Sequence, residues 1–236
     1  MPRGILRLGS LGVAALPFLT SACAGAVGSE TDAPLTPAAQ RSNESRAAAA
    51  SADAASERVE LERLRELAKS PDPAATGRLI EAASDAQASP AVTAEAKRLL
   101  AARRTGAEYM LEALESDRPP VGALAEALLA MREAKAAPLL ARVLNEPSTD
   151  SEDLEKVARA LSELATPAEK EELETFFMLY RATASDPAQV KAVVSVAKAL
   201  LRVGGEEGRE LIKSAEADHL TDVEVQKLLA PLTAEE

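Results

Sequence analysis

The hydrophobic positions of this chain recur at helical spacing over most of its length. The clearest stretch follows Asp186-Pro187, a capping side chain before a proline at the first helical position. Its apolar positions fall three or four residues apart, namely Val190, Val193, Val194, Ala197, Leu200, Leu201 and Val203. Gly204-Gly205 end this helix, and a second begins near Glu206. The pattern predicts an antiparallel helix pair.

The same pattern recurs along the chain, and Ser89-Pro90 predicts another capped helix start. Apolar residues follow five leucines at similar distances, and these anchor leucines are Leu67, Leu99, Leu128, Leu161 and Leu200. They are 32, 29, 33 and 39 residues apart, which is typical of stacked helical repeats. About five antiparallel helix pairs are therefore predicted over residues 54–232. A last helix from Val223 to Leu229, with Thr221 as its cap, would close the end of the array.

The composition indicates an all-α fold. Hydrophobic residues make up 47% of the chain but aromatics only 2%, so alanine supplies much of the apolar surface and allows close helix packing. No sustained alternation of β-branched residues predicts a strand.

The first 22 residues have the pattern of a secretory leader. Arg3 and Arg7 precede an apolar run from Leu8 to Leu19, which is too short to span a membrane. Residues 23–53 are rich in Ala, Ser and Pro and predict a flexible tether, although the alanine-rich part from Arg46 onward would also suit a helical extension.

The leader ends in Leu19-Thr20-Ser21-Ala22-Cys23, which resembles the lipobox of bacterial lipoproteins. The resemblance implies that the leader is removed and that Cys23, the only cysteine, becomes lipid-modified and begins the mature chain. It also implies that Ala24 directs the protein to the outer membrane, facing the periplasm. The alternative is an ordinary leader that leaves an exported protein without lipid.

The strings AAPLLARVLNE, DLEKVARALSELA and DPAQVKAVVSVAKALLRVG resemble HEAT repeats. This implies a right-handed α-solenoid, with the first helix of each pair on the concave side. The family's ladder of Asp and Arg on successive inner helices is not in register here, and tetratricopeptide-like packing is the alternative.

Charge and residue content argue against several function classes. The formal charge is -11, and removal of the leader with Arg3 and Arg7 makes it -13, which disfavours nucleic acid as a ligand. The only histidine, His219, has no cysteine nearby to form a catalytic pair, and a zinc site fails for the same reason. We expect no enzyme activity, cofactor or metal.

Two features are candidates for protein binding. The run Phe176-Phe177-Met178-Leu179-Tyr180 is too wide for one buried stripe, so Phe177 and Tyr180 are candidate exposed contacts, although a core position is favoured. The second feature is a set of basic residues on the predicted concave helices, Arg98, Arg132, Arg159, Lys191, Lys198 and Arg202. They would suit an acidic protein segment, and scattered solvated charges are the simpler interpretation.

These observations predict a lipid-anchored scaffold of a bacterial envelope that binds another envelope protein. The alternative is a periplasmic carrier or chaperone that shelters an apolar ligand or an unfolded segment in the solenoid groove. An apolar concave lining would favour the carrier, and a charged lining would favour the scaffold.

Overall fold

The computed structural model describes residues 37–116 and 119–234, with side chains from residue 50. The leader, Cys23 and residues 23–36 of the predicted tether lie outside these ranges. The chain divides into two units between Arg46 and Ala47. Of the first unit, the described residues 37–46 belong to helix α1.

The described residues form helices and no strand, so the all-α prediction is confirmed. Short 3-10 turns precede three of the helices, at Arg104–Gly106, Ala134–Ala136 and Pro167–Glu169. The helices are α1 Pro37–Lys69, α2 Pro73–Ser84, α3 Pro90–Ala102, α4 Ala107–Leu114, α5 Val121–Met131, α6 Ala137–Leu144, α7 Ser151–Leu164, α8 Lys170–Tyr180, α9 Pro187–Val203, α10 Gly205–Ala217 and α11 Val223–Ala234.

Capping side chains set several of the helix starts. Ser89 accepts a hydrogen bond from the Val92 amide, and Asp186 accepts from the Ala188 and Gln189 amides, which confirms both predicted caps. The prediction that Thr221 caps α11 is wrong. Asp222 accepts from the amides of Glu224 and Val225 instead, while Thr221 is buried and accepts from Arg181.

The predicted tether needs a correction. Residues 37–53 are helical and belong to α1, so the flexible segment predicted over 23–53 is wrong for this part, and the alternative of a helical extension is confirmed from Arg46 and begins already at Pro37. Alanine has the highest intrinsic helix propensity, and the alanine-rich run through residues 47–50 therefore continues the helix that contains Leu64.

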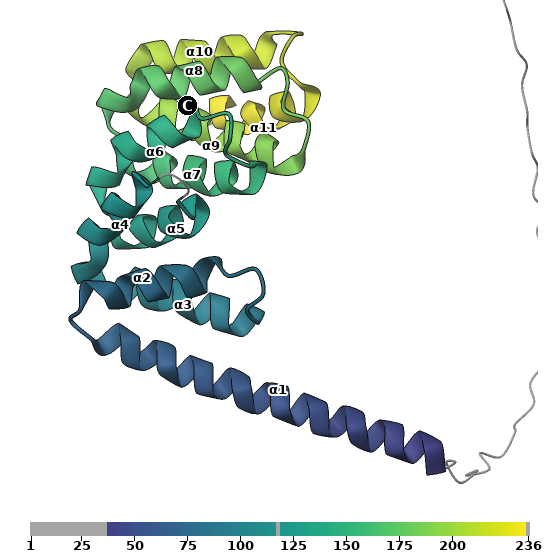
Figure 1. Ribbon diagram of the computed structural model, residues 1–236. Helices are drawn as coiled ribbons and strands as arrows, with labels where there is room; N and C mark the ends of the chain where they lie inside the picture. Colours follow the sequence, from purple (N-terminus) through teal and green to yellow (C-terminus); the bar gives the residue numbers. More distant parts are fainter. Residues whose placement is uncertain (1–36, 117–118, 235–236) are drawn as a thin grey trace, which may run out of the picture. The chain divides into compact units, whose positions relative to one another are not determined.

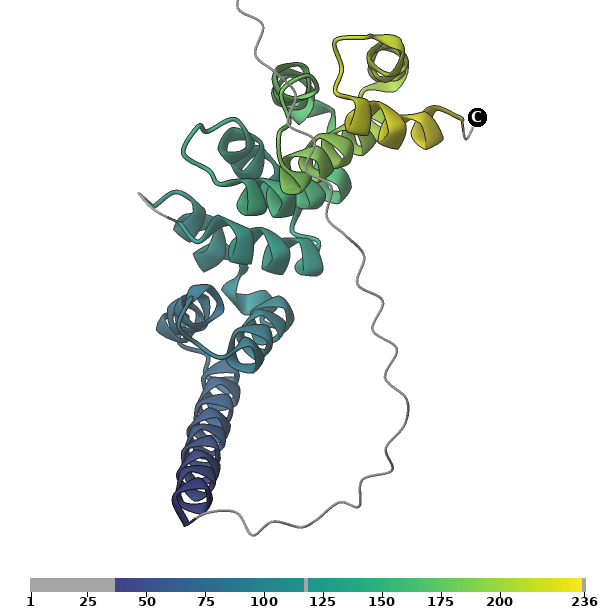
Figure 2. The same cartoon turned by 90° about the vertical axis from the view of Figure 1, so that its right-hand side faces the viewer.

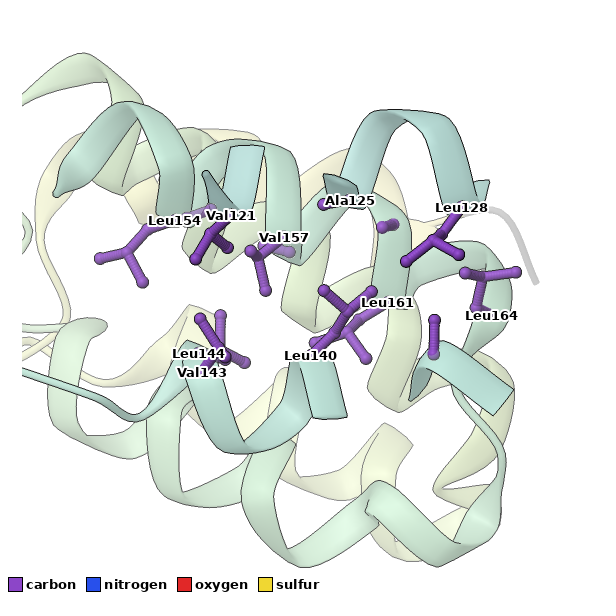
Figure 3. Packing of buried hydrophobic residues seen from close by; sticks show 14 of the residues in the cluster. Val121, Ala125, Leu128, Leu140, Val143, Leu144, Leu154, Val157, Leu161 and Leu164 are labelled. Atoms are coloured by element: carbon purple, nitrogen blue, oxygen red, sulfur yellow. The ribbon is translucent and has the colours of Figure 1, made fainter. Parts of the chain in front are cut away.

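The unit from Ala47 onward has its helices in two layers (Figures 1 and 2). The first helices of successive pairs pack on one another in the order α3, α5, α7, α9, and α11 packs on α9 and α10. The second helices α2, α4, α6 and α8 contact the first helix of the next pair, α3, α5, α7 and α9 respectively, and α10 contacts α9. Figure 3 shows leucine and valine side chains of α5, α6 and α7 meeting between the layers.

A buried alanine in each of α3, α5, α7 and α9 allows the first helices to approach one another. It stands three residues before the anchor leucine, at Ala96, Ala125, Ala158 and Ala197, and each is 0% exposed. A side chain of one carbon keeps the distance between helix axes short. The corresponding residue of α1 is Leu64, and α1 lacks the extensive backbone contacts that join the other first helices.

Two arginines join the ends of neighbouring first helices. The guanidinium of the buried Arg103, after α3, donates to the carbonyls of Ala68, Ser70 and Asp72 around the end of α1, and to the Thr76 hydroxyl. Arg202, on α9, donates to the carbonyls of Leu161, Ser162 and Ala165 at the end of α7. Most of these carbonyls lie at or just beyond helix C-termini, where intrahelical donors run out.

Gly208 provides a test of close packing. A Cβ at Gly208 would lie 2.5 Å from the Leu200 carbonyl oxygen, whereas a Cβ at Gly77 would meet only the far end of the Tyr109 side chain. We expect Gly208→Ala to lower the free energy of unfolding by about 1–3 kcal/mol through overpacking. Gly77→Ala is the matched control and should be neutral or stabilising by up to ~1 kcal/mol. Urea unfolding followed by circular dichroism measures both, and an equal effect of the two substitutions would contradict the close approach of α9 and α10.

Candidate functional site

A row of charged side chains crosses the first helices. The residue two positions before each anchor leucine is always charged, at Arg65, Lys97, Glu126, Arg159 and Lys198. We call these five residues the charged ladder. Because each stands at the same place in successive packed helices, neighbouring members come within reach of one another.

Three members of the charged ladder are joined by ion pairs. Glu126 on α5 lies 3.0 Å from Lys97 Nζ of α3 and 2.8 Å from an Arg159 guanidinium nitrogen of α7. Partial burial of Glu126 works against ionisation, but the two cations outweigh it and lower the pKa of its carboxyl. Glu126 therefore stays ionised between the two cations.

Two further ion pairs extend this row at its ends. Arg65 on α1 lies 2.9 Å from Glu95 on α3, and Lys191 on α9 lies 3.5 Å from Glu155 on α7. Hydrogen bonds from Arg98 and then Arg65 lower the pKa of Glu95 to about 2. Adjacent first helices from α1 to α9 are thus linked by charged side chains on their exposed side.

A polar hollow lies beside the charged ladder between α5, α7 and the start of α9. It has a volume of about 610 Å³, and its lining includes Glu126, Glu155, Arg159 and Lys191. At its edge the Asp186 carboxylate accepts from the Ser151 hydroxyl, 2.8 Å away, while it also caps α9. This lining offers hydrogen bonds and charge to a polar segment and little apolar surface to a lipid-like ligand.

The predicted basic contacts have different surroundings. Arg98, Arg159 and Lys191 are engaged by carboxylates, and Arg202 by helix-end carbonyls. Lys198 is exposed and forms no ion pair with any residue that the structure describes. Arg132 is also exposed and ends α5 in the left-handed conformation at a φ of 55°. A partner-binding role for all six stays a prediction.

The two aromatic residues predicted as exposed contacts, Phe177 and Tyr180, are buried to different degrees. Phe177 is fully buried together with Phe176, so the prediction of an exposed contact at Phe177 is wrong. The reason is that Leu173, Phe176 and Phe177 fall three and four residues apart on one face of α8, and this face is the buried one. Tyr180 is partly buried, and its ring centroid lies 4.6 Å from that of Phe176. The exposed members of this run are Met178 and Leu179, at 48% and 59%.

Other chemistry has little structural basis in the described part of the chain. His219 is 91% exposed, with Nδ1 3.7 Å from the Asp218 carboxylate. Residues 37–116 and 119–234 contain no group of three His, Cys, Asp or Glu side chains placed to share a metal ion. Within the same ranges, no helix is long and apolar enough to cross a membrane.

The Glu95 ion pairs predict a dependence of stability on pH. A carboxyl whose pKa falls from 4.5 to about 2 on folding stabilises the folded state above pH 4.5, and this contribution disappears as pH falls toward 2. We expect Glu95→Gln to lower the urea midpoint at pH 7 by a small amount, since exposed pairs contribute under ~1 kcal/mol each. The difference from wild type should vanish near pH 2. Glu163→Gln on the exposed side of α7 is the control, and a Glu95→Gln deficit that persists at pH 2 would contradict the assignment.

Comparison of the chain with protein-family models, with curated proteins and with solved structures found no match.

Proposed function

We propose that this protein is a lipid-anchored scaffold of a bacterial envelope, attached through Cys23 and binding another envelope protein through its helical repeats. The array is a HEAT-like, right-handed solenoid whose first helices line the concave side. The lipid on Cys23 holds it at the outer membrane, facing the periplasm. The protein acts without catalysis, cofactor or metal, and its partner is a protein and not a nucleic acid.

The observation that carries this proposal is the charged ladder. A groove that shelters an apolar ligand needs an apolar lining, because an ion loses its hydration there without compensation. The exposed side of the first helices instead carries Lys97, Glu126, Arg159 and Lys198, and the adjoining hollow is also lined by charged groups. Such a surface favours a polar protein partner over the carrier alternative.

Lys198 is the member of the charged ladder best placed to contact an acidic segment. Lys97 and Arg159 share Glu126, whereas Lys198 is exposed and lies on the same face of α9 as Lys191, seven residues earlier. A charge without an ion pair contributes more to a new complex, because no existing interaction has to be broken.

The anchoring is tested by comparing wild type with Cys23→Ser. Membranes are fractionated, associated proteins are recovered, and the mass of the mature N-terminus is measured. We expect wild type to carry acyl mass at Cys23 and to recover a protein from the membrane fraction, and Cys23→Ser to be soluble. An unmodified Cys23 with a bound small molecule would contradict the scaffold and support the carrier.

The binding face is tested by charge reversal. We expect Lys198→Glu to reduce recovery of the partner by roughly 30-fold, because it replaces an attraction of ~1 kcal/mol by a repulsion of similar size. Lys227→Glu on the exposed side of α11 makes the same change of charge away from the charged ladder and should leave recovery unchanged. Equal losses from both would show that net charge, not this face, governs binding.

A further inference from the structure

The first helix pair differs from the others where α1 meets the array. Seven residues before the anchor leucine, α3, α5, α7 and α9 bury an apolar side chain, at Val92, Val121, Leu154 and Val193. In α1 the corresponding residue is Glu60, which is half-exposed. Leu64 also replaces the small alanine of the other first helices, so the apolar stripe of α1 is short, from Leu61 to Ala68, and lacks the small side chain that close packing needs.

A wedge-shaped groove lies between α1 and the two helices α2 and α3. The helices diverge from the short loop at Ser70–Asp72 (Figure 1), and the groove between them has a volume of about 1080 Å³. Leu67, Ala82 and Ala88 contribute partly exposed apolar side chains to its lining, whereas Leu64 and Val92 are buried. This volume is large enough to hold several side chains of a bound segment.

The lining of the groove changes from apolar to acidic along α1. Leu64 and Leu67 lie toward the loop where the helices meet, and Glu60, Glu57 and Asp53 follow toward the open end. Glu81 on α2 and Asp85 at the end of α2 contribute two further carboxylates to the groove. The cations in its lining are the two guanidinium groups of Arg63 and Arg78. Arg63 is already paired with Glu60, 3.1 Å away.

We propose that this groove binds a basic amphipathic helix of a partner protein. The apolar side of that helix lies against Leu67 and Ala82, and its lysines or arginines lie beside Glu57 and Glu81. Charge complementarity selects this occupant, because five carboxylates face two cations across the groove. A second copy of this chain fits poorly, since its formal net charge is -11. The inference rests on the proposed role in protein binding and names the chemistry of one partner segment.

The test uses a synthetic peptide as the probe. The peptide is ~18 residues long, about five helical turns, with leucine at every third or fourth position and lysine between. Its partner is the full chain with Cys23→Ser, and binding is measured by fluorescence polarisation. We expect binding that weakens with added salt, and affinity at least about tenfold lower for the same peptide with glutamate in place of lysine.

Variants of the groove separate it from general acidity. Glu57→Lys with Glu81→Lys should lower the affinity roughly tenfold or more, since two favourable charge contacts become unfavourable. Glu146→Lys with Glu171→Lys changes net charge equally on exposed sites of other helix pairs and should retain binding. Ala88→Trp, at the groove lining near the start of α3, should block the peptide while circular dichroism shows an unchanged fold.

Three outcomes would overturn the inference. They are equal binding of the lysine and glutamate peptides, equal effects of the two charge-reversed pairs, and concentration-dependent self-association that the groove variants abolish. Because the peptide assay needs neither lipid nor membrane, it can fail while the Cys23 fractionation succeeds. It can also succeed while that fractionation fails, so the two proposals stand or fall separately.

Discussion

The close approach of successive first helices depends on an alanine at their contact. Ala96, Ala125, Ala158 and Ala197 stand at one repeated position and are fully buried. A single helix cannot bury its own apolar stripe, so the core forms only when neighbouring helices stack closely. Each alanine contact buries little apolar area, and burial of apolar area contributes about 25 cal/mol per Å². The stability of the fold is therefore distributed over many interfaces.

The repeated spacing that places apolar residues of the first helices in the core also places charged residues at matching positions on their exposed face. The charged ladder lies one residue after the buried alanine in each first helix, so helices held close by Ala125 and Ala158 bring Glu126 and Arg159 together. Where the register changes, the packing changes. Leu64 and Glu60 in α1 replace an alanine and a valine or leucine of the later helices, and a groove lies between α1 and its neighbours.

Much of the helical structure could be predicted from local sequence. Asp186-Pro187 and Ser89-Pro90 are capping signals that act over a few residues, and both start helices as expected. Errors arose where tertiary contacts decide. Phe177 is buried because it shares the packed face of α8 with Leu173 and Phe176, and Thr221 is drawn away from capping by Arg181, forty residues earlier in the chain.

The candidate site was harder to predict because its members are paired across helices. The sequence shows which residues are basic, but Arg159 is engaged by a glutamate 33 residues earlier in the chain. A search for Asp and Arg at one repeated position misses this row, because its members are Lys, Glu and Arg. The signal that would have found it is the presence of any charged residue two positions before each anchor leucine.

Photocrosslinking in the cell tests the central claim, protein binding by the exposed faces of the repeats, most directly. A photoreactive residue is placed at Glu152 in the polar hollow, at Ala88 in the groove lining, or at Glu146 between helix pairs as the control. The account predicts discrete adducts with an envelope protein from Glu152 and Ala88, and none from Glu146. Absence of protein adducts at both test positions, or the same adducts from all three, would contradict it.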